Sequence, residues 1–115
     1  MSSYIVNKPW GYEEIWAHTP EYLGKILFVR QGFRLSLQHH KHKKESMRIS
    51  KGKVILTLED EHGKMQEYHL SPGDSMDIPN GRKHRLFAAE DSEIIEVSTP
   101  EINDIIRHED DYGRL

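Results

Sequence analysis

Several features are absent from this sequence, and each absence excludes a class of protein or site. None of the 115 residues is cysteine, so any bound metal must use His, Glu, Asp, Gln or water as ligands. No segment approaches the roughly 18 apolar residues that a membrane helix needs. The first nine residues also lack the basic start and apolar run of a signal peptide. We therefore expect a cytoplasmic protein that does not associate with a membrane.

The charge balance argues against a nucleic-acid partner. The formal net charge is -3, whereas domains that bind nucleic acids carry a basic excess. The basic residues between Lys41 and Arg48 are interpreted as a solvated loop, because no aromatic residues interleave with them as single-strand binding requires. Eight histidines is a high number for this length, and histidine is the commonest metal ligand in proteins.

Short segments with apolar and polar residues in alternation are separated by turns that contain Gly or Pro. Such a series, without a long helical period, is typical of an all-β sandwich or barrel. The strands are expected over residues 12–16, 23–29, 33–40, 45–49, 53–59, 65–70, 75–78, 84–88 and 93–98. The strands over 53–59 and 65–70 are expected to pair across the turn at 60–63.

The length of 115 residues fits one domain. We expect its core over about 23–99, an N-terminal strand or arm over 1–22 and a C-terminal cap over 100–115. Residues 101–111 are expected to form either a short helix or a capping segment. The apolar face of the strand over 33–40 would pack against another sheet or a second subunit, which predicts a homodimer.

Four polar residues form a candidate metal site. Gln38 and His40 are two residues apart in the strand over 33–40, so their side chains point the same way. Glu45 begins the next strand, and His84 follows a turn much later in the chain. A barrel can bring all four to its inner wall, where two imidazoles, a carboxylate and an amide oxygen suit a divalent cation. Positions would stay open for water or substrate, as in catalytic metal sites.

The spacing of these residues resembles the two motifs of the cupin family. The first motif begins at Gly32, contains the first three candidate ligands and ends at Gly52, with Gln38 where a His usually stands. The second begins at Gly73 and continues through Pro79 to His84. The resemblance implies a single-domain cupin, which is a double-stranded β-helix or jelly-roll barrel.

Over nearly the whole chain the sequence is similar to the cupin domain of type II mannose-6-phosphate isomerases. The similarity rests on five runs, at residues 8–11, 34–38, 78–86, 95–97 and 104–114. That family uses a Gln, His, Glu, His metal set, which implies the same roles for Gln38, His40, Glu45 and His84. The sequence departs from the family where Lys43 replaces Arg and where Ser46-Met47 replaces His-Trp.

The resemblance implies aldose–ketose isomerisation of a sugar phosphate in carbohydrate or polysaccharide metabolism. One divalent ion, zinc or alternatively manganese, nickel or iron, would hold the substrate oxygens. His42 or a metal-bound hydroxide would move the proton. Arg34, Lys43 and Arg85 are the candidates for binding the phosphate, and Arg34 and Arg85 are also candidate catalytic residues.

Two alternatives stay open at this point. One is a non-catalytic cupin that uses a metal to bind a sugar or a small anion, which the departures at Lys43, Ser46 and Met47 favour. The other is an iron-dependent dioxygenase, because cupins also host that chemistry. Fold alone does not decide between these functions.

Overall fold

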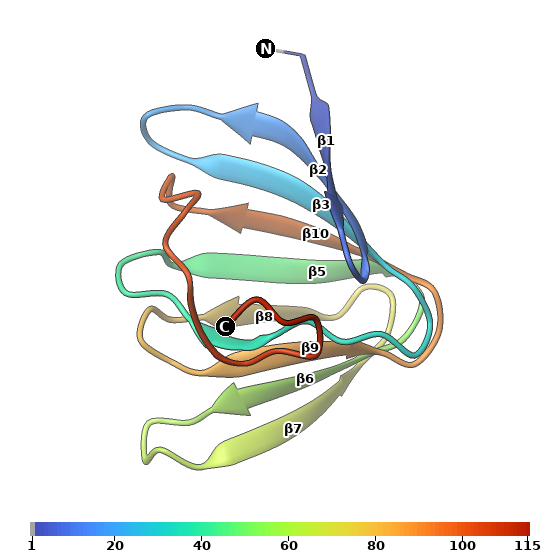
Figure 1. Cartoon of the computed structure of the whole chain (residues 1–115), viewed down its shortest axis with the longest axis vertical. Helices are drawn as coiled ribbons and strands as arrows, with labels where there is room; N and C mark the ends of the chain where they lie inside the picture. Colours follow the sequence, from blue (N-terminus) through green and yellow to red (C-terminus); the bar gives the residue numbers. More distant parts are fainter. Residues whose placement is uncertain (1) are drawn as a thin grey trace.

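The computed structural model of this protein describes residues 2–115, which form eleven strands and no helix (Figure 1). The strands are β1 (Tyr4–Lys8), β2 (Gly11–His18), β3 (Leu23–Val29), β4 (Leu37–His39), β5 (Glu45–Lys51), β6 (Val54–Glu59), β7 (Met65–Leu70), β8 (Ser75–Ile78), β9 (His84–Ala88), β10 (Ser92–Ser98) and β11 (Ile106–Glu109). Within residues 2–115 there is accordingly no helix of the length and apolar character needed to cross a membrane.

The strands form two antiparallel sheets that enclose the core. One sheet has the order β1-β2-β3-β10-β5-β8, and the other has the order β11-β4-β9-β6-β7. Strands distant in sequence thus become neighbours, as β10 does between β3 and β5 (Figure 1). The all-β class and the barrel architecture predicted from the sequence are confirmed.

Alternation of apolar residues fixes which face of each strand is buried. In β6, every second residue is buried, as a strand with one face on a core requires. Leu56 of β6, Ile49 of β5 and Ile94 of β10 are fully buried, and Ile94 lies directly opposite Ile49 in the register. These side chains fill one part of the interior, which leaves the remaining part to polar residues.

The structure confirms most of the expected strands, including the pairing of β6 with β7. The strand expected over 33–40 is wrong in length, because only Leu37–His39 is regular. Arg34 makes a single isolated bridge to Phe87, and both Leu35 and Ser36 line the interior cavity. Two successive residues on one side break the alternation on which the longer strand was predicted.

The C-terminal segment is a strand rather than a short helix. Ile106 and Arg107 of β11 pair with His39 and Gln38 of β4, and the chain then continues across the barrel (Figure 1). β4 offers unpaired backbone groups at that edge of the sheet, and β11 satisfies them. The segment thus adds a strand to the sheet edge, and its expected role as a cap stays a prediction.

The outer face of the six-stranded sheet carries apolar side chains in contact with solvent. Ile5, Trp16 and Val97 are each between 43% and 53% exposed. The predicted homodimer stays a prediction.

Candidate metal centre and its cavity

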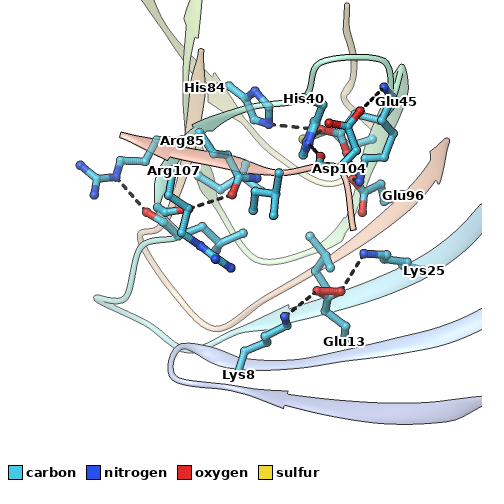
Figure 2. A pocket seen from close by; sticks show the side chains of 18 of the residues that line it. Lys8, Glu13, Lys25, His40, Glu45, His84, Arg85, Glu96, Asp104 and Arg107 are labelled. Carbon is cyan, nitrogen blue, oxygen red and sulfur yellow. Dashed lines mark hydrogen bonds and ion pairs between the residues drawn. The ribbon is translucent and has the colours of Figure 1, made fainter. Parts of the chain in front are cut away.

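The two sheets enclose a polar cavity of about 290 Å³ (Figure 2). Charged side chains dominate its lining, with six Lys or Arg residues and four Asp or Glu residues. The cations are Lys8, Lys25, Lys43, Arg85, Arg107 and Arg114, and the acids are Glu13, Glu45, Glu96 and Asp104. An excess of cations in a confined space favours an anionic ligand.

Three of the four predicted ligands converge at one side of this cavity. Glu45 Oε1 lies 3.0 Å from His40 Nε2 and 3.2 Å from His84 Nε2. One ligand atom from each of the three residues falls within 4.8 Å of the others, and all three side chains are buried. They come from three places, since His40 follows β4, Glu45 begins β5 and His84 begins β9. The barrel fold brings these three segments together.

Backbone carbonyls orient the two imidazoles. His40 Nδ1 contacts the carbonyl oxygen of Asp104, and His84 Nδ1 lies 3.0 Å from the carbonyl oxygen of Arg82. Because a carbonyl oxygen only accepts, each Nδ1 donates its hydrogen, and the Nε2 atom of each ring points to the centre. Metal-bound histidines are commonly oriented by this kind of contact.

Both Nε2 atoms face the Glu45 carboxylate, and a metal cation at this point would bind all three groups. His84 Nε2 is buried, and among residues 2–115 it has no hydrogen-bond partner of good geometry despite its approach to Glu45. Burial alone would raise the pKa of Glu45, but its contacts with His40 and His84 outweigh burial and hold the pKa far below its usual range. Two imidazoles and one ionised carboxylate fit a divalent cation.

Gln38 lies beside this group on the same wall of the cavity. It pairs directly with His84 across β4 and β9, and its side chain lines the cavity. The Ser36 hydroxyl donates a hydrogen bond of 2.8 Å to Gln38 Oε1, which orients the amide. The structure thus brings all four predicted ligands to one site, and their roles as ligands stay predictions.

Asp104 organises the loop between His40 and Glu45, a function that the sequence did not reveal. Its carboxylate accepts hydrogen bonds from the backbone N–H groups of Lys41, His42 and Lys43, at 2.6 to 2.9 Å. Burial alone would raise the pKa of Asp104, but these three donors lower it to about 2. The same residue also supplies the carbonyl that orients His40.

We expect the Asp104→Ala variant to bind metal about 10- to 100-fold more weakly, since residues that orient ligands commonly have effects of that size. Isothermal titration of the metal-free protein measures this. The matched control is Asp60→Ala, because Asp60 accepts from two backbone N–H groups and Gln66 in the distant β6–β7 turn. Equal losses of affinity in both variants would contradict a specific role for Asp104.

The low pKa of Asp104 also predicts a dependence on pH. A carboxylate with a depressed pKa stabilises the fold above its ordinary pKa of 3.8, and this contribution disappears as the pH falls toward about 2. The free energy of unfolding of Asp104→Ala should therefore fall less steeply than that of the wild type as the pH falls from 3.8 to about 2, which acid unfolding measures.

Two residues predicted for the site lie outside the cavity. His42 is exposed and does not line the cavity, because its backbone rather than its side chain faces the C-terminal segment. Arg34 also lies outside the cavity, since its guanidinium donates to the Asp111 carboxylate at 2.6 and 2.8 Å on the surface. Neither side chain is placed to act on a ligand in the cavity.

Lys43 and Arg85 do line the cavity, but carboxylates already hold them. Lys43 Nζ lies 3.9 Å from Glu45 Oε2 and 3.7 Å from Glu96 Oε1. Lys43 is only 4% exposed, so its interpretation as a residue of a solvated loop was wrong. Burial lowers the pKa of its ammonium group, and Glu45 opposes this effect.

Arg85 belongs to the border of the cavity rather than to its centre. Its Nε donates to the Leu35 carbonyl oxygen at 2.8 Å, and its other nitrogens approach Glu109 and Asp111. This residue therefore joins the C-terminal segment to the barrel. Its predicted contact with a phosphate stays a prediction.

A second charged group faces the metal centre from the opposite side of the cavity (Figure 2). Lys25 donates a hydrogen bond of 2.9 Å to the buried carboxylate of Glu13, and Lys8 lies 3.6 Å from the same carboxylate. Alternation along β2 places Glu13 inside, next to the apolar Ile15. The available signal in the sequence was an acidic residue two positions before the apolar Ile15, on the face of the strand that alternation turns inward. This residue was not predicted to be functional.

Comparisons with known proteins place this cavity in context. A family model described as mannose-6-phosphate isomerase C-terminal matches residues 2–113. A mannose-1-phosphate guanylyltransferase of Escherichia coli is 31% identical over 114 residues, which cover 95% of this chain and 23% of that protein. The chain thus spans about a quarter of the length of its curated relative.

Solved structures agree on the fold. KdgF from a Halomonas species has a TM-score of 0.76 and 25% identity, over 90% of this chain and 92% of that one. Oxalate decarboxylase from Bacillus subtilis, a protein with Mn(II) centres, has a TM-score of 0.79 and 17% identity, over 92% of this chain and 30% of that one. Both are cupin barrels, and the second similarity concerns the fold alone.

Proposed function

Because this chain belongs to the mannose-6-phosphate isomerase C-terminal family of cupins, we propose that it is a metal-dependent sugar-phosphate isomerase. The proposed reaction interconverts mannose 6-phosphate and fructose 6-phosphate. The single observation that carries the proposal is the convergence of His40, Glu45 and His84 in a cavity lined by an excess of cations. Metal donors and positive charge in the same enclosed space match a substrate that has both a carbonyl group and a phosphate.

The proposed metal is zinc, with manganese, nickel or iron as alternatives. Two histidines and one glutamate are a common ligand set of catalytic zinc, with a further position open to water or substrate. A divalent ion bound there would act as a Lewis acid on the carbonyl and hydroxyl oxygens of the sugar. His40, Glu45 and His84 would hold it, with Gln38 beside them.

Glu13 is the chain's best-placed group to transfer the proton between adjacent carbons. Isomerisation removes a proton from the carbon next to the carbonyl and returns one to the former carbonyl carbon, so one carboxylate can serve both steps. Glu13 faces the ligand triad across the cavity (Figure 2). The ammonium groups of Lys8 and Lys25 hold its carboxylate in position. Burial of the cavity limits competing exchange with water.

A coupled assay with mannose 6-phosphate and fructose 6-phosphate tests the proposal. We expect turnover by protein loaded with zinc, manganese, nickel or iron, and a fall of about 100-fold or more in kcat for Glu13→Gln. Glu14→Gln is the matched control, because Glu14 is the next residue of β2 and points to the opposite face. Absence of turnover by fully metallated wild-type protein would contradict the isomerase proposal for this substrate pair.

A specific observation supports a second candidate, a cupin that binds a sugar or small anion without turnover. The Lys43 ammonium lies 3.9 Å from Glu45 Oε2, so a cation of the chain itself already approaches a proposed metal ligand. Tight binding of mannose 6-phosphate with no turnover would favour this candidate.

A further inference from the structure

Arg107 differs from the other cations that line the cavity. Lys8 and Lys25 pair with Glu13, Lys43 lies between two glutamates, and Arg85 and Arg114 each have acidic partners in the C-terminal segment. Among residues 2–115, no carboxylate lies within ion-pairing distance of Arg107, and its Nε is buried without a hydrogen-bond partner. The cavity is therefore lined by one guanidinium that has no ion-pair partner among residues 2–115.

An uncompensated guanidinium in a confined site is unfavourable. Burial lowers the pKa of Arg107, and the positive charge of nearby Arg114 lowers it further. Asp110 and Glu13 offset part of this charge from a distance, but the Asp110 carboxylate already forms a bidentate pair with Arg114. A buried charged donor without a partner costs free energy that a ligand acceptor can restore. An anion that enters the cavity would supply the missing partner.

The register places Arg107 in line with the proposed metal ligands. Arg107 of β11 is opposite Gln38 of β4, and Gln38 is opposite His84 of β9. Directly opposite residues in antiparallel strands point to the same face, with Cβ atoms about 5 Å apart. The Cβ atoms of Arg107 and His84 are therefore roughly 10 Å apart along one wall. A sugar phosphate that lies along this wall can present its carbonyl end to the histidines and its phosphate to the guanidinium.

We propose that Arg107 binds the phosphate group of a sugar phosphate whose carbonyl end lies at His40, Glu45 and His84. This inference rests on the proposed sugar-phosphate function and assigns its phosphate subsite. A guanidinium donates two parallel hydrogen bonds to phosphate oxygens, which supplies the partner that Nε lacks. Gln38, between the two ends, faces the middle of the sugar. The assignment replaces Arg34, which lies outside the cavity.

Calorimetric titration of metal-loaded protein with mannose 6-phosphate and with mannose tests this subsite. The wild-type protein should bind the phosphate ester at least 10-fold more tightly than the free sugar. Arg107→Gln should lose at least 10-fold in affinity for the ester and little for the sugar. The affinity of Arg107→Lys for the ester should lie between those of the wild type and Arg107→Gln, because lysine retains the charge but not the paired donors. Arg48→Gln, on the exposed outer face of β5, is the matched control and should bind as the wild type does.

Thermal unfolding separates loss of binding from loss of fold. Arg107→Gln should unfold at the wild-type temperature or above, because it removes an uncompensated charge beside Arg114. Mannose 6-phosphate should raise the unfolding temperature of the wild type more than that of Arg107→Gln.

The outcomes distinguish this inference from the isomerase proposal. Equal affinity of wild type and Arg107→Gln for mannose 6-phosphate would overturn the subsite, even if the wild type turns the ester over. A wild type that binds mannose and its phosphate equally well would overturn it too. Loss of affinity in Arg107→Gln without any wild-type turnover would support the subsite and count only against the isomerase.

Discussion

Replacing His84 with alanine should reduce the metal content of the purified protein to less than about a tenth of the wild-type content. The substitution removes an imidazole whose buried Nε2 lies 3.2 Å from Glu45. Loss of a direct ligand should lower the metal affinity by more than the roughly 10- to 100-fold expected for loss of a residue that orients a ligand. Elemental analysis after dialysis against metal-free buffer measures the content. His40→Ala should behave in the same way.

His69→Ala is the matched control for these variants. His69 is 70% exposed on β7 and has a single carboxylate neighbour, Glu67, at 3.0 Å. It should retain the wild-type metal content. If His84→Ala and His40→Ala also retained it, metal bound elsewhere in the chain would account for the content, and the proposed centre would be wrong.

Removing the metal should destabilise the fold substantially. A ligand that binds only the native state stabilises it by about 4 kcal/mol when its free concentration is about 1,000 times Kd. For a domain of this size that corresponds to a fall of roughly 15 °C in Tm after chelation. The centre joins the segments around β4, β5 and β9, so its ligands are far apart in the unfolded chain.

Calorimetric scans with and without chelator measure this effect, and added metal should reverse it. His84→Ala supplies the control, because a variant without the site should have the same Tm in both conditions. A wild-type Tm that does not change with chelation would show that native-state metal binding contributes little to stability.

The sequence placed Gln38 and His40 on one face because their spacing is local, whereas Glu45 and His84 come from other strands. Gln38 and His40 are two residues apart and therefore share a face in any extended chain. The strand on which this depended is much shorter than expected, yet its regular part includes Gln38. The burial of residues near the ligands was predicted less well, and Lys43, which was expected in a solvated loop, is the clearest case. Its burial depends on Glu96 of β10, which no local pattern associates with it.

The rest of the cavity could not be predicted from local patterns, because other segments supply it. Asp104 holds the loop after His40 from more than 60 residues away, and Arg107 reaches the cavity only because β11 adds to the edge of β4. Segment 101–111 showed no clear period, so a helix and a cap were equally acceptable. The pairing that decides between them is a property of the assembled sheet.

The most direct test of the metal centre is a crystal structure of the metal-loaded protein with anomalous diffraction at the absorption edge of the metal. The account predicts one anomalous peak in the cavity, within about 2.0–2.2 Å of His40 Nε2, His84 Nε2 and a Glu45 carboxylate oxygen if the ion is zinc. A peak coordinated by other residues, or no peak in the cavity of fully loaded protein, would contradict it.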